Sequence, residues 1–330
     1  MDEQLPDSKI LRRTYSYVGV CYTVLLIVST IAQLATAWMP YWIGGAQNAL
    51  SQTPWWTWVC MTLPLYAVAM PLCYLMMRRL PAEAPEKHPL SARQILALIP
   101  ICVCVMYAGN LVGSLLSLLL SGGEAQNAVA ELAMDNHPLK FVMMVIAAPV
   151  FEELICRKVL LDRVKQYGEL LSAVMSGAIF GLLHQNFFQF FYAFGLGFVF
   201  SWIYLRCGRI VVSMLFHMGI NFLGAVVAPA VVSLVDLEAL EALNIATVTA
   251  EQLIQILPGY LLLLAYSFMM IALSVTGLIV FLYNRKHLTW QPTAWDLPLK
   301  TTLKPSLLNI GMIVYILSCA AMFVFSLVAS

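Results

Sequence analysis

Long apolar segments recur along the whole chain and restrict its fold more than any other feature. Nine are visible, at residues 16–38, 54–77, 94–120, 140–161, 170–184, 187–205, 210–231, 255–283 and 305–329. A helix needs about 20 apolar residues to cross a bilayer, and most of these segments reach or approach that length. The chain is 61% apolar and 11% charged, with a mean hydropathy of +0.84. No soluble globular domain of this length has such a composition.

The fold class follows from the lipid solvent. A bilayer admits helices or closed barrels, and these segments are too long for barrel strands. We therefore expect an all-α, polytopic transmembrane bundle of about eight or nine membrane helices around a buried polar core. No internal repeat, nucleotide-binding loop or basic nucleic-acid patch is present, so nucleic acid is not an expected partner.

Basic residues alternate between the connections and predict the orientation. They gather before the first segment and in every second loop after it, at Lys9, Arg12, Arg13, Arg78, Arg79, Lys87, Arg93, Arg163, Lys165, Arg206, Arg209, Arg285, Lys286, Lys300 and Lys304. The remaining loops are acidic or uncharged. By the positive-inside rule the basic loops and the N-terminus are cytoplasmic, and we expect a bacterial plasma membrane protein. Residues 236–252 predict a short external amphipathic helix.

Two adjacent carboxylates, Glu152 and Glu153, lie inside the segment 140–161. Ionisable groups in a bilayer are costly and mark functional sites by default. Glu153 and Arg157 are four residues apart, so they share a helix face and form a natural ion pair. Glu152 lies about 100° further round the helix and is left free for chemistry. An ion pair that only neutralises two charges would explain Glu153 and Arg157 but not Glu152.

Two histidines fall inside later predicted helices, His184 and His217. His217 and Asn221 are four residues apart and share a helix face, as do Phe180 and His184. A lone histidine in a membrane helix is more often a packing residue than a ligand, but depth favours a common site here. At about 1.5 Å of rise per residue, Glu152, both histidines and Asn221 come out near mid-membrane.

Three motifs follow one another in order: Glu-Glu-x-x-x-Arg at 152–157, Phe-x-x-x-His at 180–184 and His-x-x-x-Asn at 217–221. The ordered set resembles the CPBP family of intramembrane proteases, also called the ABI or type II CAAX-prenyl-protease family. The resemblance implies an endopeptidase that cleaves a membrane-associated peptide or protein. It also divides the chain into N-terminal helices without a family signature (1–137), a CPBP-like catalytic core (138–231), and an external segment with C-terminal helices (232–330).

The chemistry of these residues fits hydrolysis. A carboxylate in a poorly solvated cavity suits a general base that takes a proton from water near neutral pH. We assign that role to Glu152, with His184 holding the same water. Neutral His217 and the Asn221 amide are the expected donors to the oxyanion.

Metal dependence and the supporting residues stay open. Glu152, His184 and His217 match a catalytic zinc ligand set by type, and Glu153 would then be the base. They come from three helices, however, and lack the HExxH spacing by which a zinc site is recognised in a sequence. Glu153 and Arg157 would orient the carboxylate helix, with Phe180 as a further supporting residue, or Arg157 would bind a substrate carboxylate.

Other classes of protein compete with the protease. A non-enzymatic binding protein of the bacteriocin-immunity type needs only the cavity, although it need not retain the complete polar set. A transporter also buries ionisable groups near the midplane, but repeat symmetry is expected of it and none is visible. The aromatic run Gln185–Tyr192 would line a cavity or, more commonly for such runs, face lipid and neighbouring helices.

Overall fold

The computed structural model describes residues 8–44, 53–236, 249–285, 289–295 and 297–328 of the 330-residue chain, apart from the side chains of 54, 252 and 253. Within these ranges all regular structure is helical, which confirms the predicted all-α bundle. The external helix expected at 236–252 lies mostly outside the described residues.

The helices follow the predicted apolar segments. Proline and glycine residues interrupt several of them, and short π-helical segments, labelled η2, η3, η4 and η6, join the pieces; η5 is a single 3₁₀ turn. The elements are α1 (Ser8–Gly44), α2 (Pro54–Leu63), η2 (Pro64–Ala69), α3 (Met70–Met77), α4 (Ala92–Ser121), α5 (Ala128–Met134), η3 (Phe141–Ala147), α6 (Ala148–Glu153), η4 (Leu154–Val159), α7 (Leu160–Val164), η5 (Lys165–Tyr167), α8 (Glu169–Leu183), α9 (Phe187–Cys207), α10 (Ile210–Phe222), η6 (Leu223–Val227), α11 (Ala228–Val232), α13 (Ala250–Asn284), α14 (Leu299–Leu307) and α15 (Ile310–Val328).

Seven of the described helices are long and apolar enough to cross a membrane: Lys9–Gly44, Trp55–Met77, Ala92–Ser121, Phe187–Cys207, Ile210–Val232, Ile254–Asn284 and Ile310–Val328. Glu169–Leu183 is apolar but shorter. The carboxylate-bearing stretch from η3 to α7 is not among the seven. The sequence predicted nine apolar segments, and the two that are not among these seven spans are 140–161 and 170–184.

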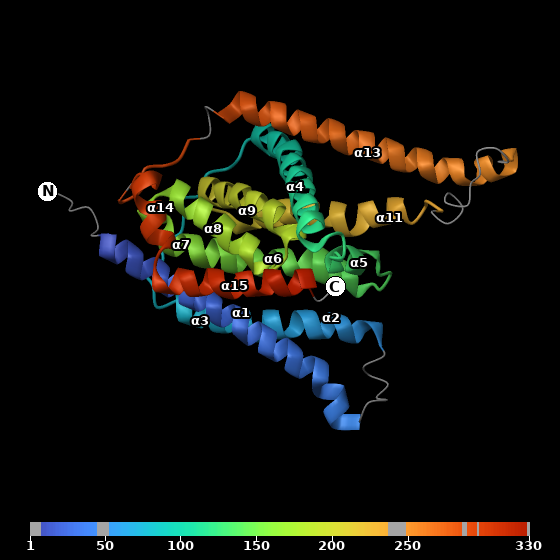
Figure 1. The fold of residues 1–330 in the computed structure, drawn as a ribbon. Coiled ribbons are helices and arrows are strands. Elements are labelled where there is room, and N and C mark those ends of the chain that lie inside the picture. Colours follow the sequence, from blue (N-terminus) through green and yellow to red (C-terminus); the bar gives the residue numbers. More distant parts are fainter. Residues whose placement is uncertain (1–7, 45–52, 237–248, 286–288, 296, 329–330) are drawn as a thin grey trace.

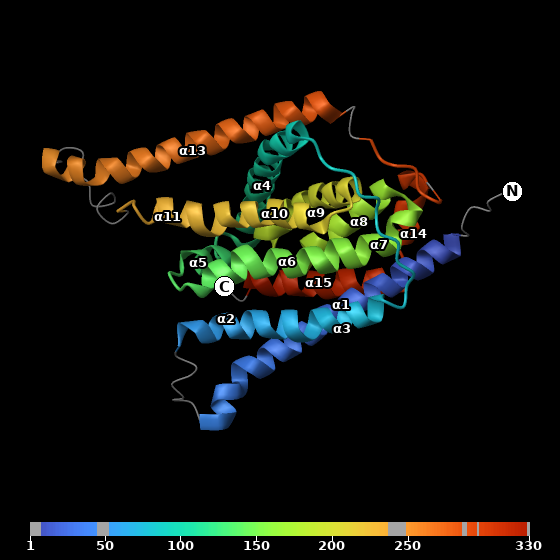
Figure 2. The ribbon, with the colours of Figure 1, turned by 180° about the vertical axis from the view of Figure 1, so that it is seen from behind.

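The basic loops gather at one end of the bundle. Lys165 pairs with Glu83 at 2.7 Å, and Arg206 donates to the Thr289 hydroxyl at 2.8 Å. The backbone N–H of Trp295 donates to the carbonyl of Gln166 at 3.1 Å. The C-terminal end of α15 lies at the opposite end, beside α5 (Figures 1 and 2). The connections predicted to share one side of the membrane are therefore adjacent in space.

The centre of the bundle is formed by α8 and α9, which pack closely and antiparallel. Their backbones approach at two glycines: a Cβ added to Gly197 would lie 3.0 Å from the Cα of Gly177 and 3.2 Å from Nη2 of Arg157. A larger residue at 197 would collide with both. In contrast, α13 lies apart at the edge, against α4 (Figure 1). The small residues of α9 thus make room in the core for the Arg157 side chain.

Candidate active site

The Glu153–Arg157 pair is sealed inside the protein. Nη1 of Arg157 lies 3.3 Å from Oε1 of Glu153, and both side chains are 0% exposed, which confirms the ion pair expected from their spacing. The Arg157 guanidinium also stacks on aromatic rings, with Cζ 4.3 Å from the centroid of Phe180 and 5.7 Å from that of Phe200. The alternative that Arg157 binds a substrate carboxylate is wrong, because its side chain reaches no open surface.

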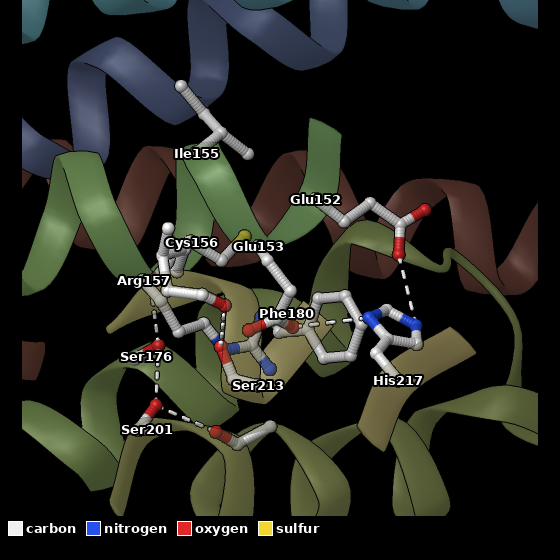
Figure 3. Close-up of polar contacts among 12 residues, drawn as sticks. Glu152, Glu153, Ile155, Cys156, Arg157, Ser176, Phe180, Ser201, Ser213 and His217 are labelled. Carbon is white, nitrogen blue, oxygen red and sulfur yellow. Dashed lines mark hydrogen bonds and ion pairs between the residues drawn. The ribbon is translucent and has the colours of Figure 1, made fainter. Parts of the chain in front are cut away.

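Glu153 also fixes the orientation of His217. Nδ1 of His217 lies 3.1 Å from Oε1 of the carboxylate (Figure 3). An ionised carboxylate only accepts hydrogen bonds, so Nδ1 carries the proton. The other ring nitrogen, Nε2, then bears a lone pair when the ring is neutral and donates only when the ring is protonated. This geometry refines the expected role of His217, because a neutral ring held this way offers no donor to an oxyanion.

Glu152 has a different environment from its neighbour. Its side chain is 20% exposed, and Oε2 lies 3.7 Å from Nε2 of His217 (Figure 3). Glu152 therefore faces the free nitrogen of His217, whereas Glu153 holds the other nitrogen.

His184 ends α8 and is held by its own helix. Its Nδ1 donates to the carbonyl oxygen of Phe180 at 2.8 Å. A carbonyl oxygen cannot donate, so this nitrogen carries the proton, and Nε2 is an acceptor when the ring is neutral. The Phe180 ring contacts both histidines edge-on, with centroid distances of 4.8 Å to His184 and 5.6 Å to His217. Phe180 is therefore the spacer between Arg157 and the two imidazoles.

Asn221 has a structural partner that the sequence motif did not reveal. Its Nδ2 donates to the carbonyl oxygen of Met144 at 2.8 Å. Within η3 the N–H of Ala148 bonds to the carbonyl of Met143, five residues earlier. The next N–H in this register would serve Met144, but residue 149 is proline and has none. Asn221 takes that place with one N–H of its amide and retains a second.

One cavity, with a volume of about 510 Å³, brings Glu152, His184, His217 and Asn221 together. Its walls also include Phe180 and come from α1, α2, η2, α4, α5, η3, α6, α8, α9, α10 and η6. No lysine or arginine is among the described residues that line it. The other lining residues that bear hydrogen-bonding groups are Gln33, Trp58, Thr62, Tyr66, Tyr107, Asn110, Asn127, Gln189 and Tyr192.

The zinc ligand set fits by chemistry but not by position. Both histidines have Nδ1–H held by an acceptor and Nε2 free, as metal-bound histidines usually do. Within the part of the chain that the structure describes, however, no three His, Cys, Asp or Glu side chains are close enough to hold a metal ion.

The fold and site together define a polytopic helical membrane protein with a buried Glu–Arg–His cluster beside a polar cavity. Residues 135–223 match the family model described as "Type II CAAX prenyl endopeptidase Rce1-like". This segment contains all three motifs, so the resemblance that the motifs predicted is confirmed over it. With its apolar helices, the match identifies the chain as an integral membrane protein.

A curated relative covers part of the same chain. It is the protein of Bacillus subtilis (strain 168) named "Putative membrane peptidase YdiL", which is 29% identical over 102 residues. The match covers 30% of this chain and 42% of the relative, so the chain spans less than half of that protein's length. No solved structure matches the chain.

The aromatic run after His184 has a mixed role. Phe187 and Phe190 pack against the hydrophobic core, as such runs usually do. Gln189 and Tyr192 line the cavity, and Tyr192 also packs against the core. Gln189 and Tyr192 are three residues apart, so helical spacing predicts that they share a face. The sequence alone does not say which face of the helix lines the cavity.

Proposed function

We propose that the chain is an intramembrane endopeptidase that cleaves a membrane-associated peptide or protein substrate. The observation that carries the proposal is the convergence of Glu152, His184, His217 and Asn221 on one cavity, beside a buried ion pair that holds one of them. The family match and the peptidase relative support the same activity. We further propose a bacterial plasma membrane as the location, with the N-terminus on the cytoplasmic side.

Charge balance sets the protonation of the site. Glu153 and Arg157 neutralise each other, and an isolated charge in such a place is expensive. Glu152 and His217 together are neutral when they hold one proton between them. With that proton on Nε2, His217 is an imidazolium flanked by two carboxylates, and Glu152 is ionised.

The ionised Glu152 would act as the general base. A water in the cavity can donate one O–H to the Glu152 carboxylate and the other to Nε2 of His184, which must accept. Glu152 takes the first proton while the water oxygen attacks the peptide carbonyl carbon. The oxyanion accepts from Nε2–H of His217 and from the second N–H of Asn221. Glu152 then returns its proton to the leaving nitrogen as the C–N bond breaks, which gives a carboxylic acid and an amine.

A survey of peptide termini in membranes tests the proposal. Cells would express wild type, Glu152→Gln or Glu131→Gln at matched levels, and membrane peptides would be compared by mass spectrometry. Glu131 is an exposed acid of α5 and serves as the control. New termini that occur with wild type and Glu131→Gln, and vanish with Glu152→Gln, would support the protease and identify its substrate. Equal termini in all three samples would contradict it and favour a non-catalytic binding protein.

A further inference from the structure

A chain of polar side chains leads from His184 along the start of α9 to the cavity. It consists of Asn186, Gln189 and Tyr192, and every hydrogen bond in it has a direction that the chemistry fixes. The first step is Asn186, whose Oδ1 accepts from the backbone N–H of Gln189 at 2.9 Å. Its Nδ2 donates to the carbonyl oxygen of His184 at 2.7 Å. A backbone N–H only donates and a carbonyl only accepts, so the amide of Asn186 has one possible orientation.

The orientation of the Asn186 amide fixes the orientation of the Gln189 amide. The second N–H of the Asn186 amide donates to Oε1 of Gln189 at 2.8 Å. Oε1 is therefore the acceptor end of the Gln189 amide, and Nε2 is the donor end. This Nε2 donates to the hydroxyl oxygen of Tyr192 at 2.9 Å.

The Tyr192 hydroxyl is consequently an acceptor from Gln189, and its own O–H must donate elsewhere. Among the described residues, no protein acceptor takes this O–H. Tyr192 lines the cavity together with Glu152, and its ring centroid lies 6.5 Å from that of His184. A hydrogen-bond donor is thus aimed into the space where a ligand would bind.

We propose that Tyr192 is a substrate-binding donor, whose hydroxyl bonds to a backbone carbonyl oxygen of a peptide bound in the cavity, and that Gln189 is the positioning residue that directs it. The inference rests on the proposed function. A neutral acceptor is favoured because no lysine or arginine is among the described residues of the cavity wall. An anionic ligand would have no cation to meet there.

Two variants separate direction from packing, and two more serve as controls. Tyr192→Phe removes the hydroxyl and keeps the ring. Gln189→Glu keeps the acceptor for Asn186 but replaces the donor with a carboxylate oxygen, which captures the Tyr192 O–H and reverses the last bond. Tyr74→Phe removes a hydroxyl from an exposed tyrosine of α3 that does not line the cavity. Gln185→Glu adds the same charge next to His184, outside the chain of bonds.

The experiment has a turnover arm and a binding arm. Both use the full-length protein in detergent micelles and quenched-fluorescence peptides of about ten uncharged, mainly apolar residues. Turnover is followed as kcat/KM, and binding is measured as Kd on protein that also carries Glu152→Gln. Thermal unfolding checks that each variant folds.

We expect Tyr192→Phe and Gln189→Glu each to weaken binding and lower kcat/KM by about 2- to 10-fold, the worth of one neutral hydrogen bond. The double variant should lose no more affinity or kcat/KM than the more damaging single variant, because both changes remove the same hydrogen bond between Tyr192 and the peptide. Tyr74→Phe and Gln185→Glu should stay within about twofold of wild type.

Unchanged binding and turnover in folded Tyr192→Phe would overturn the inference while leaving the protease intact. Additive losses in the double variant would overturn the directional role of Gln189. If wild type cleaves no peptide but still binds one through Tyr192, the proposed function fails and the inference stands.

Discussion

Glu152 and Glu153 are neighbours in the chain, yet they occupy opposite environments. Glu153 is completely buried between Arg157 and His217, whereas Glu152 is one-fifth exposed and faces a cavity. The angle of about 100° between successive helical residues produces this separation. One carboxylate lies within the buried charged cluster, and the other faces the cavity in which we propose that water and substrate bind.

The contrast teaches how a membrane protein can use two acids at one depth. A buried charge is tolerated when it is paired, and Glu153 has both a permanent cation and an imidazole N–H. Glu152 has only the free nitrogen of His217, 3.7 Å away. A group with an incomplete set of partners is available for proton transfer, so function should depend on Glu152 and stability on Glu153.

The largest expected effect is on turnover in Glu152→Gln. The amide cannot take a proton from water, so cleavage should fall by about 100- to 10,000-fold. A fluorogenic peptide assay on purified protein measures this. Turnover within twofold of wild type would end the assignment of Glu152 as the base.

Arg157→Met tests whether the buried Glu153–Arg157 pair stabilises the fold. It leaves Glu153 charged and buried with no permanent cation, which should cost about 3 to 5 kcal/mol of folding free energy. The double variant Arg157→Met/Glu153→Gln should recover much of that loss, since no lone charge remains. Thermal unfolding in detergent measures both. A single variant as stable as wild type would show that the ion pair is not structural.

Asn221 is expected to contribute to both catalysis and stability. Asn221→Ala removes one of the two proposed oxyanion donors, and loss of one such donor typically costs about 100- to 1000-fold in rate. It also leaves the Met144 carbonyl without a donor, which costs about 1 to 3 kcal/mol in stability. In a Pro149→Ala background the new backbone N–H can serve that carbonyl, so Asn221→Ala should then cost less stability but just as much rate. Equal stability costs in the two backgrounds would contradict the link to Pro149.

A smaller effect is expected at Asp135, at the end of α5. The N–H of His137 and the indole N–H of Trp58 donate to its carboxylate, and these bonds lower the pKa of Asp135 below its ordinary 3.8. The folded state therefore binds this proton less readily than the unfolded state. Its stabilisation is present above pH 3.8 and is lost as the pH falls through the lower folded value. Wild type should be more stable than Asp135→Asn at pH 7, and in unfolding scans the difference should shrink as the pH falls from 3.8 through the lower folded pKa of Asp135. A constant difference across that range would exclude the linkage.

The smallest effect should come from metal removal. In the proposed mechanism, proton transfer runs through Glu152 and no step needs an ion. Treatment of purified protein with a zinc chelator should leave cleavage within about twofold of the untreated rate. Loss of activity on chelation, with recovery on adding zinc, would instead make Glu152, His184 and His217 ligands and reopen Glu153 as the base.

Much of this arrangement was predictable because it is local. Helical periodicity sets the Glu153–Arg157 pair at a spacing of four, and it places Glu152 on another face. Apolar segments set the helices. Both depend on residues near one another in the chain.

The contacts between helices were not predictable. Spacing cannot show that Glu153 meets His217, 64 positions later, or that Asn221 meets Met144. Pro149 carried a signal for the second contact, because a proline inside a helix frees a carbonyl upstream. The partner that satisfies that carbonyl depends on how the helices pack.

The most direct test of the account compares Glu152→Gln and Glu153→Gln in one preparation, with cleavage rate and thermal unfolding measured on the same detergent samples. The account predicts that Glu152→Gln abolishes cleavage and unfolds near the wild-type temperature, whereas Glu153→Gln unfolds at a clearly lower temperature because Arg157 is left uncompensated. Cleavage by Glu152→Gln, or equal destabilisation by the two changes, would contradict it.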